Sequence, residues 1–311
     1  MRNFDPALYL EGLHMSPVDT FYLKACIENA MARFPSAKFL MDIQQLLPRG
    51  HVPPLGPALK ELAIDVPIID SCNLQCDACT HRAALLKDAP PRPIDNIVAD
   101  LERLARIRHS FPLSIYILGG EPLLHPELPR ILHIAAEILP HAHRCVTTNM
   151  LLYENGGEVE EALLETSTTL RYSDYPAFHD STCLKVESAL DAGVSVEISG
   201  ESPARFNRYK ASSSLISPLA QHQHCRGQLC PVLRDGTMWL CAYTGYNDAV
   251  NNAYGTALVA HPYDSVPLAD IEALDEIAAL LLLPHPSCRH CHVDVGMSWG
   301  CKAPEKSDFV V

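Results

Sequence analysis

The sequence has few basic residues, no long apolar run and no export signal, and each absence excludes a class of protein. Its 24 Lys and Arg against 37 Asp and Glu give a net charge of -13, so we expect no nucleic-acid partner. No run reaches the roughly 18 apolar residues of a spanning helix, so we expect no membrane partner. The first residues read MRNFDPALYLEGLH and lack a secretion-type apolar segment, which predicts a cytoplasmic protein.

Twelve cysteines are the informative part of the composition. Disulfides are rare in a reducing compartment, and a chain of 311 residues buries enough apolar surface to fold without them. Cysteines in such a protein more often bind metals or act in catalysis. Three of them lie between residues 72 and 79, and six lie between residues 225 and 301. We therefore expect metal or cluster ligands in these two regions.

The chain divides into three segments by pattern. Residues 1–60 look helical and end in a Pro-rich stretch, 48–57. Residues 61–215 alternate strands with helices, which predicts an α/β fold with a parallel sheet covered by helices. Residues 216–311 are less regular and carry the second cysteine region.

The middle segment sets out five strands and four helices. The expected strands cover residues 62–69, 113–118, 144–147, 168–172 and 194–198. The expected helices cover residues 94–105, 127–139, 159–165 and 183–192. In parallel sheets of this kind, functional residues gather in the loops after the carboxyl ends of the strands.

The loop after the first expected strand reads CNLQCDAC over residues 72–79. Thiolates of Cys72, Cys76 and Cys79 can converge on one metal centre. Three protein ligands are one short of a closed structural site, and an open position is where metal chemistry occurs. The alternative is a structural zinc with a distant fourth ligand such as His81.

Polar residues stand at the ends of the later strands as well. In the sequence GGEP over residues 119–122, two glycines let backbone groups approach a ligand, and the carboxylate can hold an ammonium group. Polar side chains at successive strand ends can converge on one small polar molecule, although each alone is more often a cap or turn residue. These further strand-end residues are Thr148, Asn149, Ser173, Glu197 and Ser199.

Together, the CxxxCxxC and GGEP motifs in this strand order resemble the radical S-adenosylmethionine (radical SAM) superfamily over residues 62–200. The resemblance implies a partial (β/α)6 barrel. It also implies a [4Fe–4S] cluster that binds S-adenosylmethionine at its open iron and generates a 5′-deoxyadenosyl radical. The implied cluster ligands are Cys72, Cys76 and Cys79. The implied S-adenosylmethionine contacts are Gly119, Gly120, Glu121, Pro122, Thr148, Asn149, Ser173, Glu197 and Ser199.

Two positions depart from the pattern of that superfamily. Ala78 stands where many members have an aromatic residue before the third cysteine, and Met150 stands where many have glycine. The first departure leaves the contact to adenine open, and neither changes the cluster ligands.

The second cysteine region contains Cys225, Cys230, Cys241 and a CxxC over residues 288–291. A hairpin at Asp235-Gly236 would bring Cys225 or Cys230 near Cys241. Four thiolates close either a structural zinc site or a [4Fe–4S] centre, and the spacing alone leaves both open. The region resembles the twitch subdomain, a relative of the SPASM extension. That resemblance implies an auxiliary [4Fe–4S] cluster held by Cys225, Cys241, Cys288 and Cys291, with Cys230 as a substitute for Cys225.

Cys230 and Cys301 remain without an implied ligand role. Each is either a small buried thiol or a donor of a hydrogen atom to a substrate radical. The second reading is a hypothesis that rests on their closeness in sequence to the expected auxiliary cluster.

The resemblance implies a reaction class but no substrate. Our leading hypothesis is a radical SAM oxidoreductase that dehydrogenates a small-molecule sugar or aminocyclitol, with the auxiliary cluster accepting an electron. The alternatives are an epimerase, a peptide-modifying maturase, and a zinc-stapled binding protein without catalysis. The oxidoreductase, the epimerase and the maturase would each need a low-potential electron donor, for which we expect a flavodoxin or ferredoxin.

Overall fold

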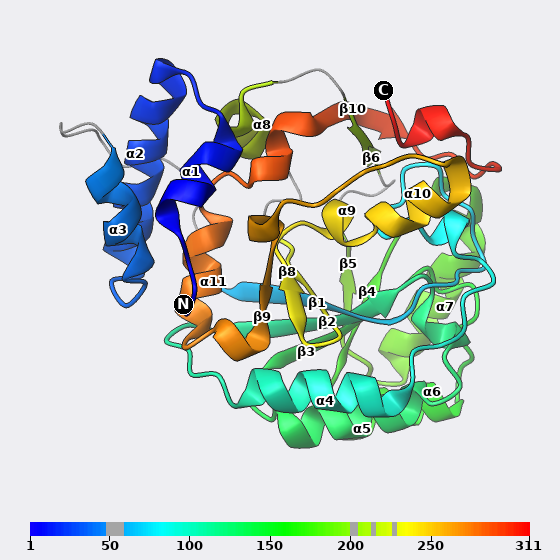
Figure 1. The fold of residues 1–311 in the computed structure, drawn as a ribbon. Helices are drawn as coiled ribbons and strands as arrows, with labels where there is room; N and C mark the ends of the chain where they lie inside the picture. Colours follow the sequence, from blue (N-terminus) through cyan, green and yellow to red (C-terminus); the bar gives the residue numbers. More distant parts are fainter. Residues whose placement is uncertain (48–58, 200–204, 213–215, 226–228) are drawn as a thin grey trace.

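The computed structural model describes residues 1–47, 59–199, 205–212, 216–225 and 229–311. The Pro-rich stretch at 48–57, expected to end the N-terminal segment, lies outside the described residues. Figure 1 shows a curved sheet flanked by helices, with the N-terminal helices at one side. Within the described ranges, no helix is long and apolar enough to cross a membrane.

The main sheet has the strand order β5-β4-β3-β2-β1-β7-β8-β9. Neighbouring strands from β1 to β5 are parallel, which confirms the predicted α/β class with a parallel sheet. The bounds are β1 (Leu62–Ile69), β2 (Leu113–Gly119), β3 (His143–Thr148), β4 (Thr169–Tyr172), β5 (Val196–Ile198), β7 (Val232–Arg234), β8 (Thr237–Trp239) and β9 (Ser265–Pro267).

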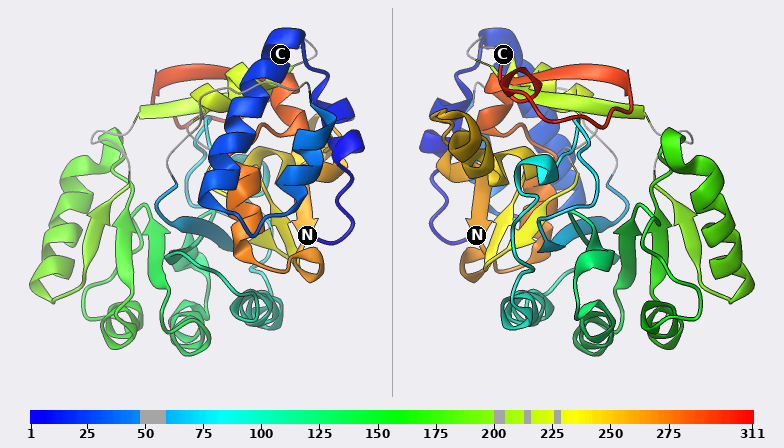
Figure 2. Two further views of the ribbon diagram at one scale, coloured as in Figure 1. Left: turned by 90° about the vertical axis from the view of Figure 1, so that its left-hand side faces the viewer. Right: turned by 90° about the vertical axis from the view of Figure 1, so that its right-hand side faces the viewer.

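The connecting helices cover the outer face of this sheet, as Figure 2 shows. They are α4 (Ile94–Ala105), α5 (Leu128–Ile138), α6 (Glu158–Thr166) and α7 (His179–Asp191). Because side chains alternate along a strand, Ile64, Ile115 and Val146 join the apolar core. The residues next to them, Asp65 and Tyr116 among them, therefore point to the inner face of the sheet.

The C-terminal segment contributes to two sheets. Strand β7 pairs parallel with β1, so β7–β9 extend the main sheet across the predicted boundary at residue 215. The β7–β8 hairpin turns at Asp235 and Gly236, whose φ angles of 50° and 75° fit the two-residue turn expected there. Strand β6 (Arg205–Ala211) pairs antiparallel with β10 (Cys291–Ser298) in a second sheet instead of joining β5. Figure 2 shows this pair above the main sheet.

The N-terminal segment is helical, with α1 (Pro6–Leu13), α2 (Pro17–Arg33) and α3 (Phe39–Leu46). Its helices pack against the C-terminal part, where Tyr9 Oη donates to the carbonyl oxygen of Pro284 at 2.8 Å. In the described residues, the remaining α-helices are α8 (Pro218–His224), α9 (Ala242–Gly245), α10 (Asn247–Tyr254) and α11 (Leu274–Leu281). The N-terminal helices and the C-terminal part of the chain therefore pack against each other.

Candidate active site and cysteine centres

The first cysteine group (Cys72, Cys76 and Cys79) lies in the loop that leaves β1. Asp70, at the start of this loop, forms a two-pronged ion pair with Arg234 on the β7–β8 hairpin, with both distances at 2.7 Å. Burial raises the pKa of Cys72 and of Cys76 to about 12, and nearby cysteine thiolates contribute. The thiolate forms therefore need a bound cation to be stable, as an iron site provides.

The two glycines after β2 hold this loop in place. A Cβ atom on Gly119 would lie 1.9 Å from the carbonyl oxygen of Ile69, and one on Gly120 would lie 1.9 Å from that of Ser71. The amides of Gly120 and Glu121 donate to these same two carbonyls at 2.7 and 3.0 Å. The two glycines were predicted to let backbone groups approach a ligand. Instead they let the backbone after β2 approach that of residues 69–71, which fixes the cysteine loop against β2.

Glu121 joins the ends of β2 and β3. Its carboxylate is 1% exposed and accepts hydrogen bonds from Thr148 Oγ1 at 2.7 Å, the Leu123 amide at 3.1 Å and the Asn149 amide at 2.9 Å. Burial raises the pKa of Glu121 to about 7, against the effect of these donors. Asn149 Nδ2 in turn donates to Asn73 Oδ1 in the cysteine loop at 2.8 Å. The structure therefore brings Glu121, Thr148 and Asn149 beside the first cysteine group.

The other predicted strand-end residues have different surroundings. The backbone amides of Ser173 and Ser199 donate to the neighbouring strands at Thr148 and Tyr172, at 2.9 and 2.7 Å. Pro122 is buried and begins a short 3-10 helix. Glu197 lies on the inner face of β5 instead, where its Oε1 is 3.5 Å from Arg171 Nε. The contact of Glu197 with Arg171 therefore does not place its carboxylate beside Glu121, Thr148 and Asn149, where the sequence pattern predicted it.

The C-terminal end of β10 lies against the first cysteine loop, which sequence reasoning missed. Trp299 Nε1 donates to Cys76 Sγ at 3.2 Å, and the Asp77 amide donates to the carbonyl oxygen of Gly300 at 3.1 Å. The backbones of Cys76 and Cys301 pair in an isolated antiparallel β-bridge, and both thiols are free. The ring of Trp299 also contacts that of Tyr175, with centroids 5.4 Å apart. Trp299 and Tyr175 thus supply aromatic side chains near the loop, where Ala78 supplies none.

These contacts correct two expectations about the remaining thiols. Cys301 lies beside the first cysteine group, where its Sγ accepts a hydrogen bond from the Gln75 amide at 3.4 Å, and not beside the second region. Both Cys230 and Cys301 are exposed, so reading them as small buried thiols is wrong. Cys230 is reachable by water, yet the protein atoms around it desolvate the thiol and raise its pKa to about 12, with Asp65 contributing. Its thiol is therefore protonated at neutral pH.

The inner face of the sheet carries charged groups that no local pattern indicates. Arg171 lies 4.5 Å from the centroid of the Tyr116 ring as well as beside Glu197. Asp65 Oδ2 is 3.8 Å from His81 Nε2, which has no hydrogen-bond partner in the described part of the chain. Burial raises the pKa of Asp65 to about 7, and Arg171 lowers it in part. A carboxylate of this kind exchanges protons near neutral pH.

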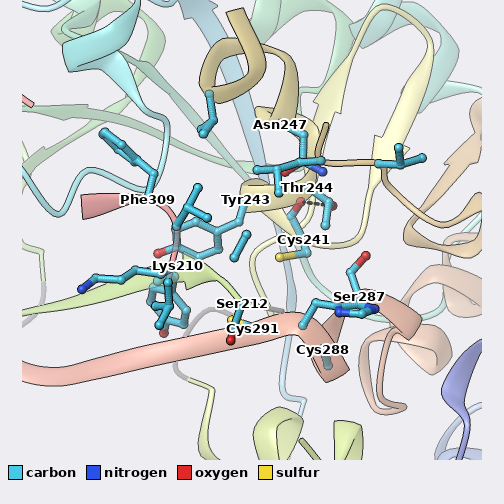
Figure 3. A pocket seen from close by; sticks show the side chains of 18 of the residues that line it. Lys210, Ser212, Cys241, Tyr243, Thr244, Asn247, Ser287, Cys288, Cys291 and Phe309 are labelled. Carbon is cyan, nitrogen blue, oxygen red and sulfur yellow. Dashed lines mark hydrogen bonds between the residues drawn. The ribbon is translucent and has the colours of Figure 1, made fainter. Parts of the chain in front are cut away.

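The second cysteine group (Cys225, Cys241, Cys288 and Cys291) lines one cavity of about 550 Å³. Figure 3 shows Cys241 on one wall, and Cys288 and Cys291 together on another. Burial raises the pKa of Cys241 to about 12, and the charge of Cys225 contributes. Cys230 is not among the lining residues, so the structure groups Cys225 with the other three.

Neither cysteine group has the arrangement of a single-ion site. Within the described ranges, no three Cys, His, Asp or Glu side chains converge closely enough to hold one metal ion. A [4Fe–4S] cluster bonds each thiolate to a different iron, so its ligands stand farther apart than those of one zinc ion. Thiolate-only donor sets of three and four fit iron–sulfur clusters in their chemistry.

A family model described as the radical SAM superfamily matches residues 66–171. The chain carries a radical SAM domain. The match spans β1 to β4 and includes the first cysteine group and Glu121. The second cysteine group lies outside the matched residues, so the auxiliary centre remains a prediction.

Curated relatives match the same domain. The GTP 3′,8-cyclase of Staphylococcus carnosus is 32% identical over 107 residues, which cover 33% of this chain and 31% of that enzyme. The GTP 3′,8-cyclase of Microcystis aeruginosa is 35% identical over 98 residues, 30% of this chain and 29% of that enzyme. The chain therefore spans about a third of the length of the curated relatives it matches, and these relatives are enzymes.

Solved structures are similar at a lower level. BtrN in complex with AdoMet and 2-DOIA has a TM-score of 0.45 at 16% identity, covering 83% of this chain and all of that one. SuiB of Streptococcus suis bound to S-adenosylmethionine has a TM-score of 0.36 at 19% identity, covering 51% of this chain and 35% of that one.

Proposed function

We propose that this protein is a radical SAM oxidoreductase that dehydrogenates a small polar substrate of the sugar or aminocyclitol type. The observation that carries the proposal is the pair of cysteine groups, one beside Glu121 at the strand ends and one around the cavity. When bound, S-adenosylmethionine and the first cluster supply a radical that abstracts hydrogen, and an auxiliary cluster accepts the remaining electron.

The strand-end residues hold the cofactor in this proposal. Cys72, Cys76 and Cys79 would hold the first cluster, and with three protein ligands they would leave it a position for S-adenosylmethionine. Glu121 receives the ammonium group of S-adenosylmethionine, which compensates a carboxylate whose pKa burial raises to about 7. The turn over residues 119–122, together with Thr148, Asn149, Ser173 and Ser199, shapes the remaining contacts. The ammonium group then pairs with the negative charge that burial disfavours on Glu121.

The inner face of the sheet binds the substrate in this proposal. Removing a hydrogen atom and an electron from an alcohol carbon also releases the hydroxyl proton. Asp65 accepts that proton, because its raised pKa of about 7 suits a base at neutral pH. Arg171 and Glu197, which are partly exposed and 3.5 Å apart, bind neighbouring hydroxyl groups as donor and acceptor.

A second candidate, epimerisation, is favoured by Cys230. Its thiol is exposed and protonated, and the charges of Asp65 and Arg171 act on its pKa, which places it near the same inner face. An epimerase would return a solvent-exchangeable hydrogen from this thiol to the substrate carbon.

One experiment separates the two. The anaerobically reconstituted protein, reduced through flavodoxin or ferredoxin as the donor expected in the cytoplasm, is screened with sugars and aminocyclitols for release of 5′-deoxyadenosine. Dehydrogenation gives an oxidised product to whose reacting carbon no deuterium is returned from D2O, and D65N slows its formation. An isomeric product that carries solvent deuterium would replace this proposal with epimerisation.

A further inference from the structure

Arg82 is a buried cation without an acidic partner in the part of the chain that the structure describes. Its side chain is 4% exposed, and Nη2 donates to the carbonyl oxygen of Tyr209 at 2.9 Å. The guanidinium carbon lies 4.9 Å from the centroid of the Tyr243 ring and 4.8 Å from that of Phe309. Among the residues that the structure describes, no Asp or Glu forms an ion pair with Arg82, and its buried Nε has no acceptor.

The backbone at Arg82 also adopts an uncommon conformation. Its φ of 53° and ψ of 26° place it in the left-handed region, which non-glycine residues rarely enter. Such strain persists where the surrounding structure requires it, often at functional sites. Here it lets Arg82 leave the cysteine loop and point its side chain into the cavity of the second cysteine group.

The position of Arg82 connects the two cysteine groups. Its amide donates to the carbonyl oxygen of Cys79 at 3.3 Å, and its side chain lines the cavity together with the whole second cysteine group. Burial lowers the pKa of Arg82, and its electrostatic interactions with Tyr243, Cys79, Cys291 and Cys241 raise it in part. A buried guanidinium is expensive unless an anion lies nearby, and thiolates are the anions within reach.

We infer that Arg82 is the shared counter-cation of two iron–sulfur clusters, one on each cysteine group. The inference rests on the auxiliary cluster of the proposed function. A cluster with thiolate ligands gains one negative charge on reduction, and a buried positive charge beside it stabilises that reduced form. Arg82 therefore raises the reduction potentials of both clusters and favours electron uptake by the auxiliary cluster.

The test is a redox titration of the full-length, reconstituted protein without substrate, followed by electron paramagnetic resonance. R82Q removes the charge, and R82M is a second neutral variant whose side chain fits between two aromatic rings. R82K keeps the charge. R144Q is the matched control, because Arg144 is also buried and donates to carbonyl oxygens, at the opposite end of β3 from the first cysteine group.

We expect R82Q and R82M to lower the equilibrium constant for reduction of the auxiliary cluster by about tenfold or more. For a one-electron couple this lowers the midpoint potential by about 59 mV. The first cluster shifts in the same direction, and R82K and R144Q stay near the wild type. If R82Q and R82M lose the auxiliary cluster while R82K and R144Q keep it, that result also supports the inference. Unchanged potentials in R82M or R82Q with both clusters loaded would overturn it. A wild type with only one cluster would overturn the proposed function instead, and the inference with it.

Discussion

Trp299 Nε1 donates a hydrogen bond to Cys76 Sγ at 3.2 Å across 223 residues of sequence. The β6–β10 pair brings the C-terminal segment to this position, and Arg208 on β6 forms an ion pair with Asp77 in the cysteine loop. The last part of the chain therefore belongs to the environment of the first cysteine group, although its own cysteines at 288 and 291 line the other centre.

Replacing Trp299 by Phe is expected to make the first cluster harder to reduce. The indole N–H stabilises negative charge on Cys76 Sγ, and that charge grows on reduction. Loss of one hydrogen bond to a charged group corresponds to about 1.5 kcal/mol. A redox titration measures the effect, with W239F on β8 as the control. Equal midpoints for the two variants would contradict this role of Trp299.

Replacing Gly120 by Ala is expected to lower the free energy of unfolding by about 2 kcal/mol or more. Its Cβ would lie 1.9 Å from the carbonyl oxygen of Ser71, and backbone cannot move aside as a flexible side chain does. Urea denaturation of the apoprotein measures the loss. In the control G157A the nearest atom lies at 3.3 Å, so its stability should change little. Similar stability of both variants would mean that the cysteine loop is not held by this contact.

Replacing Asp65 by Asn is expected to stabilise the apoprotein at pH 8 and to have less effect at pH 5. Burial raises the pKa of Asp65 from 3.8 to about 7, so folding favours the protonated carboxyl group. The protonated carboxyl group contributes its full stability below about pH 4, and this stability is lost as the pH rises through 7. Asn cannot ionise, so D65N does not lose stability over this pH range. The difference between pH 5 and pH 8 should be ~1 kcal/mol or more.

Denaturation curves at several pH values test this expectation, with D88N as the control. Asp88 is exposed, so D88N removes a carboxylate of the same type from the surface and not from the interior. A D65N variant that loses stability more at pH 8 than at pH 5 would show that Asp65 prefers the charged form in the folded protein.

Replacing Cys230 or Cys301 by Ser is expected to leave dehydrogenation in place. Both thiols are exposed, but a reaction that ends in an oxidised product needs no returned hydrogen. Product analysis in D2O measures this, with C183S on α7 as the control thiol. Loss of product in C230S together with deuterium in the wild-type product would favour the epimerase.

The sequence was sufficient for elements set by local pattern. The strand at 62–69 and the helix at 94–105 match β1 and α4, because an apolar run and a 3.6-residue period each determine one type of element. The helix expected at 183 begins at His179, where a polar first turn hides the start. The first cysteine group and Glu121 could be predicted as candidate site residues, because each belongs to a short motif at a strand end.

Long-range relationships could not be found in this way. The contact between Trp299 and Cys76, and the position of Cys301, depend on how β6 and β10 pair. The inner-face group of Asp65 and Arg171 comes from strands that only the curvature of the sheet brings to face one another. Arg82 also gave no signal, because no local sequence pattern marks a buried cation.

Metal analysis of the anaerobically prepared protein tests the central claim most directly. Two [4Fe–4S] clusters predict about eight irons and about eight sulfides per chain. The triple variant C72A, C76A and C79A should keep about four of each and release no 5′-deoxyadenosine from S-adenosylmethionine under reduction. Zinc without sulfide in the wild type, or continued release of 5′-deoxyadenosine by the triple variant, would contradict the account.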